Sequence, residues 1–244
     1  MAAGPLPAAS LNARPTATIG TTVSRKTPAA DPTPLVLYED PLSPWCLVAE
    51  RRITLALEQV PGLFGPLIHA PFPLRPEPRA LSRTERRELA RATRRAAKEP
   101  EARGLNADLW LSPDPPLCSI PALSALVAAR LQGAAREDAL RDAIREAAFV
   151  KGMNVSRTDV LVELAEQAGL DVARFSGALA RGGPERRVRE AFEDALEKGI
   201  DAAPALVIGD EWLVSGPRPV EEYRAILLQY AEVRIVGVPM RTLH

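Results

Sequence analysis

The sequence has few cysteines, histidines and aromatic residues, and these shortages exclude several classes of protein. Among its 244 residues are two cysteines and two histidines, and aromatic residues make up 5%. Two cysteines are too few for a scaffold held together by disulfides. Cys46, Cys118, His69 and His244 also lack the spacing that a zinc site requires, so we expect no resident metal.

Net charge and long apolar runs are lacking as well. Lys and Arg together number 31, as do Asp and Glu, so there is no general attraction for nucleic acid or an anionic membrane. The longest apolar run, Ala125–Ala129, is far below the roughly 20 residues that cross a bilayer. The stretch from Arg75 to Arg103 holds ten basic and five acidic residues but no nucleic-acid motif, and it predicts a solvated helix face.

Proline, by contrast, is abundant, with 24 residues, close to twice its usual frequency. Five of these prolines fall in residues 1–33, which show no periodic apolar stripe. Such a segment buries too little surface to offset the entropy of ordering, so it predicts a disordered tail. It lacks the apolar core of a secretory signal; its few basic residues faintly suggest an organelle transit peptide, but a floppy extension is favoured.

The rest of the chain alternates strand and helix patterns. Apolar runs and helical stripes predict a strand at 35–38, a helix from 44 to about 60, and a strand at 67–70. Helical stripes then continue from about 80 to Gly199, and Ser156 with Asp159 predicts a capping box in that block. Two short strands at 205–208 and 212–214 flank a hairpin turn at Gly209-Asp210, and a last helix is expected at about 219–230.

The segment Ser43-Pro44-Trp45-Cys46 opens the first helix directly after a strand. Proline suits the first helical position, so Ser43 is predicted as the N-cap and Cys46 as the third helical residue. The free N–H groups and the helix dipole at that end favour a thiolate, which is the reactive form of a cysteine. From the tetrapeptide alone, the favoured interpretation is that Ser43 is an ordinary cap and Cys46 an inert buried side chain.

These elements together resemble the DsbA family of thioredoxin-fold proteins, most closely its FrnE-like branch. The resemblance covers residues 35 to 230 and implies an α/β, thioredoxin-like fold interrupted by an α-helical insert, with a cis Pro204 facing the Ser43 turn. It rests on five segments, Tyr38–Cys46, Ala147–Val155, Ala168–Asp171, Gly199–Ile208 and Val214–Gly216.

Ser43 departs from the family's Cys-x-x-Cys motif, since it stands where the attacking cysteine is expected. Dithiol exchange needs both thiols, so the resemblance implies a thiol–disulfide oxidoreductase that works as a monothiol. In this hypothesis Cys46 forms a mixed disulfide with glutathione or a protein thiol. The implied catalytic residues are Ser43 and Cys46, and the implied substrate-binding residues are Pro44, Trp45, Ala203 and Pro204.

Two alternatives stay open. Kappa-class glutathione transferases and 2-hydroxychromene-2-carboxylate isomerases have serine at this position, and resemblance to them implies that Ser43 hydrogen-bonds the glutathione sulfur. The backbone of Ala203 would then pair with the tripeptide, and Arg218 or a residue near Ser215 could meet its γ-glutamyl carboxylate. The third reading is a non-catalytic module that binds thiols or peptides.

The expected organisation is a tail at 1–33, thioredoxin-like parts at 34–79 and 186–232, a helical insert at 80–185, and an extension at 233–244. We expect a cytoplasmic, reducing location, no bound cofactor, and glutathione as the co-substrate. The expected partner is a thiol-containing small molecule or protein rather than nucleic acid or a membrane; a homodimer stays open. Cys118 is interpreted as a free buried thiol, and acyl chemistry by Ser43 with His69 is disfavoured.

Overall fold

The computed structural model describes residues 32–236. The predicted tail therefore lies outside the described residues except for its last two positions, and residues 237–244 of the predicted extension lie outside them too. Strand β1 begins at Thr33, two residues before the predicted start, and the last helix continues to Val236, so the predicted extension begins inside a helix.

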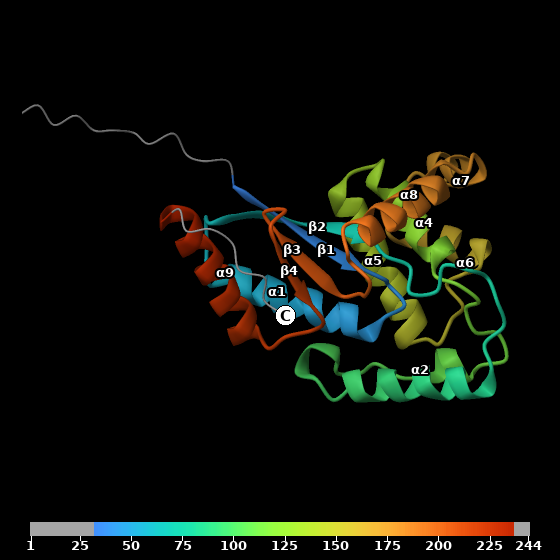
Figure 1. Cartoon of the computed structure of the whole chain (residues 1–244). Coiled ribbons are helices and arrows are strands. Elements are labelled where there is room, and N and C mark those ends of the chain that lie inside the picture. Colours follow the sequence, from blue (N-terminus) through green and yellow to red (C-terminus); the bar gives the residue numbers. More distant parts are fainter. Residues whose placement is uncertain (1–31, 237–244) are drawn as a thin grey trace, which may run out of the picture. The chain divides into compact units, whose positions relative to one another are not determined.

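Four strands form one mixed sheet in the order β2-β1-β3-β4 (Figure 1). The strands are β1 (Thr33–Glu39), β2 (Phe64–Pro71), β3 (Ala205–Ile208) and β4 (Trp212–Ser215). The pair β1–β2 is parallel, whereas β1–β3 and β3–β4 are antiparallel. The predicted strands and hairpin are thereby confirmed, and Asp210 in the hairpin turn has a positive φ of 60°.

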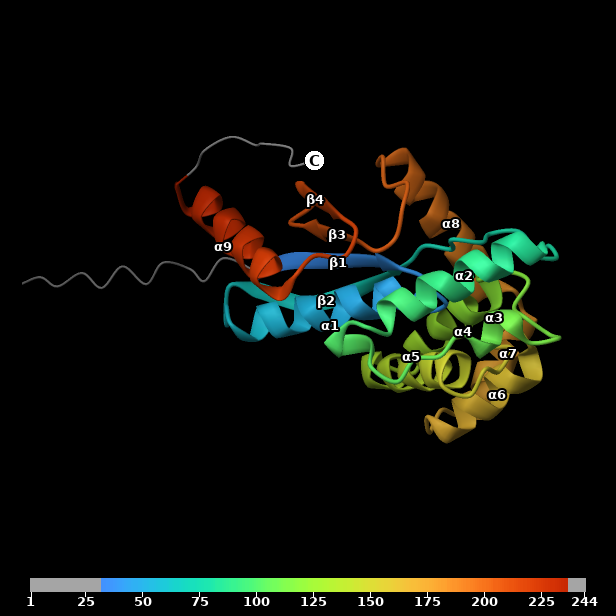
Figure 2. The same ribbon diagram turned by 90° about the horizontal axis from the view of Figure 1, so that it is seen from below.

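Helices cover both faces of the sheet, because side chains along β1 alternate between them. Leu35 and Leu37 point to a core shared with α1 (Pro44–Glu58) and α9 (Val220–Val236). Tyr38 and its partly buried neighbour Val36 join a smaller cluster with α8 (Gly183–Glu197) on the opposite face. Figure 2 shows the sheet between these two layers.

The chain between β2 and α8 is helical and builds a second core. Its elements are α2 (Arg83–Ala96), the short 3₁₀ helix η1 (Pro100–Ala102), α3 (Asp108–Leu111), α4 (Ile120–Arg130), α5 (Ala134–Phe149), α6 (Thr158–Gln167) and α7 (Val172–Ala180). Trp110, Phe149 and Phe175 are fully buried at its centre. The thioredoxin-like α/β fold with helices inserted between β2 and β3 is confirmed; the exact division at 79/80 and 185/186 stays a prediction.

One local prediction is wrong. The N-cap of α6 is Arg157 and its side chain makes no capping hydrogen bond. Ser156 instead donates its hydroxyl to the carbonyl oxygen of Cys118 at 2.8 Å, because the segment before α6 packs against the start of α4. Within residues 32–236, no helix combines the length and apolar character needed to cross a bilayer.

Candidate functional site

The turn between β1 and α1 has the predicted capping geometry. Ser43 is the N-cap with an extended backbone, and its Oγ accepts a hydrogen bond from the backbone N–H of Cys46 at 3.3 Å. Pro44 is the first helical residue, where its missing N–H leaves no donor unsatisfied. The amino end of α1 thus carries the positive end of the helix dipole, which favours an anion.

Burial opposes the reactive thiolate that the monothiol hypothesis requires of Cys46. The residue is fully buried, and burial raises the pKa of its thiol to about 12. The backbone N–H of Asp40, 3.5 Å from the sulfur, and the Ser43 hydroxyl both favour the thiolate, but burial outweighs them. Burial therefore disfavours the thiolate of Cys46.

Ser43 and Trp45 differ from Cys46 in that each keeps some exposed surface. Ser43 keeps 7% of its surface exposed, and Trp45 is half-buried. The indole of Trp45 packs against Val48 and against Ala96 and Ala102 of the neighbouring helical block. Within Ser43–Cys46, Trp45 is therefore the most accessible side chain, Ser43 keeps a small exposed fraction, and Cys46 keeps none.

Pro204 lies at the same end of the sheet as this turn. Tyr38 of β1 is opposite Ala205 of β3 in the antiparallel register, so Pro204 is next to the strand end that leads into Ser43. The Ala203–Pro204 peptide bond is cis, as the resemblance implied. The carbonyl oxygen of Pro204 accepts the N–H of Gly216 at 2.8 Å, which ties the segment to the end of β4.

Glu39, which sequence reasoning did not select, is the centre of a buried charge cluster behind the turn. Its carboxylate is 2.8 Å from Arg141 Nε, 2.5 Å from Arg145 Nη2 and 2.8 Å from His69 Nδ1. Burial alone would raise the pKa of Glu39, but Arg145, His69 and Arg141 together hold it well below its usual range. Arg141 also pairs with Glu137 at 2.6 Å. The cluster joins the end of β1 to α5.

Asp40, the next residue, fastens the turn by hydrogen bonds rather than by ion pairs. Its fully buried carboxylate accepts the N–H of Leu42 at 2.8 Å and the N–H of Leu74 at 2.9 Å. The hydroxyl of Ser119, before α4, donates to it at 2.5 Å. Three separate segments thus converge on one carboxylate, which fixes the loop ahead of Ser43.

Three potential metal ligands lie close together in the same region. Oxygen or nitrogen atoms of Glu39, Glu50 and His69 are within 4.8 Å of one another. Arg145, however, forms ion pairs with both glutamates. Their charge is therefore already compensated by a guanidinium, and the grouping is explained as part of the ion-pair cluster. His69 is engaged there with Glu39, so it is not placed as a base for Ser43.

The other predicted residues lie apart from the turn's core. Cys118 is a free, buried thiol, as predicted, and burial raises its pKa. Arg218 lies after β4, where its Nη2 donates to the carbonyl of Ser215 at 3.2 Å and its Nη1 is 3.5 Å from Glu222. Arg218 remains a predicted contact for a substrate carboxylate.

The sequence did contain a signal for the charge cluster. Glu39 and Asp40 end an apolar strand, a position where acidic residues need partners. Arg141 and Arg145 are four residues apart on one helix and directly follow Leu140 and Ile144 of the apolar stripe. A spacing of four puts both guanidiniums on one face, next to the buried side.

The sequence pattern described as "DSBA-like thioredoxin domain" matches residues 35–228. Among curated proteins, the ClpXP adapter protein SpxH of Halalkalibacterium halodurans is 32% identical over 126 residues, which cover 49% of this chain and 41% of that protein. The chain thus spans under half the length of that relative.

Solved structures with a similar fold agree with the pattern. A candidate protein disulfide isomerase from Nitrosomonas europaea has a TM-score of 0.68 at 20% identity, covering 83% of this chain and 98% of that one. The cytosolic disulfide reductase DsbM from Pseudomonas aeruginosa with GSH has 0.60 at 20%, covering 81% and 98%. A 2-hydroxychromene-2-carboxylate isomerase has 0.53 at 17%, covering 83% and 95%. At these identities the likeness establishes the fold.

Proposed function

Because the chain belongs to the DSBA-like thioredoxin domain family, whose members are thiol–disulfide oxidoreductases or isomerases, we propose that it is a glutathione-dependent enzyme in which Ser43 holds the substrate sulfur. The observation that carries this proposal is the contrast within one turn. Ser43 caps the helix and keeps 7% of its surface exposed, whereas Cys46 is fully buried with a pKa raised to about 12.

The amino end of α1 suits a thiolate that comes from the substrate. The dipole of α1 stabilises a negative charge placed beside its amino end, and the Ser43 hydroxyl can donate a hydrogen bond to the same atom. Glutathione would therefore bind with its thiol proton released to solvent. Its sulfur could then form a bond to an electrophilic carbon while the leaving group departs with the bonding electrons.

The other contacts of glutathione follow from the position of the cis-proline segment. Ala203 precedes Pro204 at the same sheet end as Ser43, and its backbone would pair with the main chain of the tripeptide. Arg218 lies beyond β4 and would meet a carboxylate. The structure of DsbM with GSH supports glutathione as the ligand to test first. A reducing, cytoplasmic location is proposed with it, in line with the two free thiols.

The test is glutathione conjugation with 1-chloro-2,4-dinitrobenzene, whose chloride leaves as the carbon–sulfur bond forms. Ser43→Ala should lower turnover by at least about tenfold, as expected for a lost hydrogen bond to a charged atom. Ser82→Ala is the matched control, because Ser82 caps α2 in the same manner, with its Oγ accepting the N–H of Glu85 at 3.2 Å. Equal activity losses in both variants would contradict the proposal.

The monothiol hypothesis makes Cys46 the nucleophile instead, and the burial of Cys46 weighs against it. Under that hypothesis Cys46→Ser abolishes glutathione-disulfide reduction while Ser43→Ala has little effect. We expect the native protein at pH 8 to react slowly with a chromogenic disulfide, because Cys46 and Cys118 are both buried, and to react rapidly at both thiols once unfolded. Rapid native labelling of Cys46 would favour the monothiol route, and activity in neither assay would favour the binding module.

A further inference from the structure

An arginine-lined cavity of about 520 Å³ lies between α2 and the segment that leads into it. Its volume falls within the range of small-molecule sites. Its lining includes none of the turn or cis-proline residues. The residues that line it are Arg75, Arg79, Leu81, Glu85, Glu88, Leu89, Arg91, Ala92 and Arg95.

The charge of this arginine pocket is unbalanced. Arg79 and Glu85 neutralise one another, with Nη2 2.5 Å from the carboxylate. Three guanidiniums, those of Arg75, Arg91 and Arg95, then remain against the single carboxylate of Glu88. Although the carboxylate of Asp40 also acts on Arg75, guanidiniums outnumber carboxylates around the cavity, and a bound anion would balance this excess.

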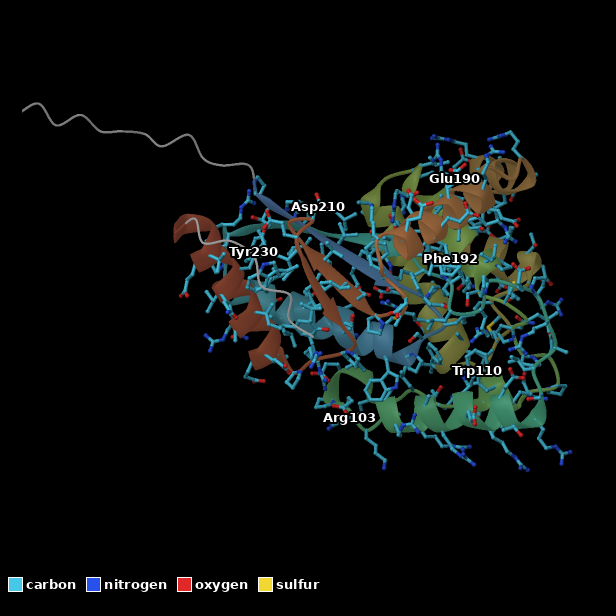
Figure 3. The ribbon with its side chains drawn as sticks, in the orientation of Figure 1. Arg103, Trp110, Glu190, Phe192, Asp210 and Tyr230 are labelled. Atoms are coloured by element: carbon cyan, nitrogen blue, oxygen red, sulfur yellow. The ribbon has the colours of Figure 1, made fainter. Side chains whose placement is uncertain are left out.

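Arg75 is held in place before any ligand arrives. Its guanidinium carbon lies 4.6 Å from the centre of the Trp110 ring, and Trp110 is fully buried, with its indole N–H donating to Thr93 on α2 at 3.1 Å. Figure 3 shows Trp110 beside α2. The Nε and Nη2 atoms of Arg75 are buried and have no hydrogen-bond partner among the described residues. Stacking on the indole thus orients the guanidinium and leaves its Nε and Nη2 donors without a protein acceptor among the described residues.

The remaining lining is apolar, formed by Leu81, Leu89 and Ala92. Guanidiniums bind phosphate oxygens in pairs of parallel hydrogen bonds, and a phosphate monoester carries nearly two negative charges at pH 7. We propose that the arginine pocket binds a small phosphate monoester whose apolar part packs on α2. This binding goes beyond the proposed glutathione chemistry and does not depend on it.

The test is a titration of the full chain with phenyl phosphate, followed by the indole N–H resonances of its three tryptophans. Trp110 should shift in a saturable manner, because its ring lies against Arg75. Benzyl alcohol, which lacks the charge, should leave the resonance unmoved, and inorganic phosphate, which lacks the ring, should bind more weakly. Absence of a saturable shift of Trp110 would overturn the proposal.

Two double variants on α2 give the matched comparison. Arg91→Gln with Arg95→Gln should raise the dissociation constant of phenyl phosphate at least about tenfold. Arg87→Gln with Arg94→Gln removes the same charge from exposed positions of the same helix that do not line the pocket, and should change it less than about twofold. Equal losses in both would show general attraction and contradict the proposal. Ser43→Ala should bind phenyl phosphate normally, which separates this result from the fate of the proposed function.

Discussion

The arginines of α5 and those of α2 differ in burial and in the number of carboxylates that they contact. Arg141 and Arg145 on α5 are 2% and 4% exposed, and each meets at least two carboxylates. Arg91 and Arg95 on α2 are exposed and form no ion pair within residues 32–236. Removing a guanidinium from water is costly unless anions replace the water. The two buried arginines are therefore bound by carboxylates that the folded protein needs for its stability. The exposed pair stays free for a ligand.

The largest effect should come from breaking the buried cluster. Glu39→Gln leaves Arg141 and Arg145 without their shared carboxylate, so we expect a loss of about 3 to 5 kcal/mol in the free energy of unfolding. Urea denaturation followed by circular dichroism measures it. A loss below about 1 kcal/mol would mean that Glu137, Asp138 and Glu50 alone satisfy the two arginines. The inference that Arg141 and Arg145 need Glu39 for stability would then be wrong.

The same carboxylate should make stability depend on pH in acid. Burial opposes the ionisation of Glu39, yet its arginine and histidine partners lower its pKa overall. A group with a lowered folded-state pKa contributes stability above its unfolded pKa, and this contribution is lost as the pH falls below it. The stability difference between the natural chain and Glu39→Gln should therefore narrow from about pH 5 downward. A constant difference across that range would contradict the assignment.

A smaller loss is expected at Asp40, where the carboxylate meets hydrogen-bond donors instead of arginine ion pairs. Asp40→Asn weakens the acceptance of the Leu42, Leu74 and Ser119 donors and turns an amide N–H₂ toward some of them. We expect a loss of about 2 kcal/mol in the same unfolding measurement. A loss as large as that of Glu39→Gln would remove the distinction between a site of ion pairs and a site of hydrogen bonds.

The smallest effect should come from an exposed ion pair. Glu185 lies 3.0 Å from Arg189 one turn later on α8, and about half of each side chain is exposed. Because solvent screens such a pair, Glu185→Gln should change the free energy of unfolding by less than about 0.5 kcal/mol. A change above about 1 kcal/mol would show that solvent exposure does not decide how much an arginine ion pair contributes to the free energy of unfolding.

The order of strands and helices could be predicted because it follows from periodic apolar patterns. The turn at Ser43–Pro44 could be predicted because capping depends on neighbouring residues alone. The pKa of Cys46 could not, since the helix end and burial act in opposite directions and the sequence does not measure burial. The sequence indicated that Glu39 and Arg145 each need a partner, but it could not show that they pair with one another. They are 106 positions apart in the chain.

Serine at position 43 has one further consequence. Its oxygen both closes the first turn of α1 and stands at the place where a dithiol enzyme needs sulfur. Sulfur is a weak acceptor, so exchanging Ser43 for cysteine would supply a nucleophile and loosen the start of the same helix. The side-chain atom at position 43 can therefore serve well as the helix cap or as the nucleophile, but not as both.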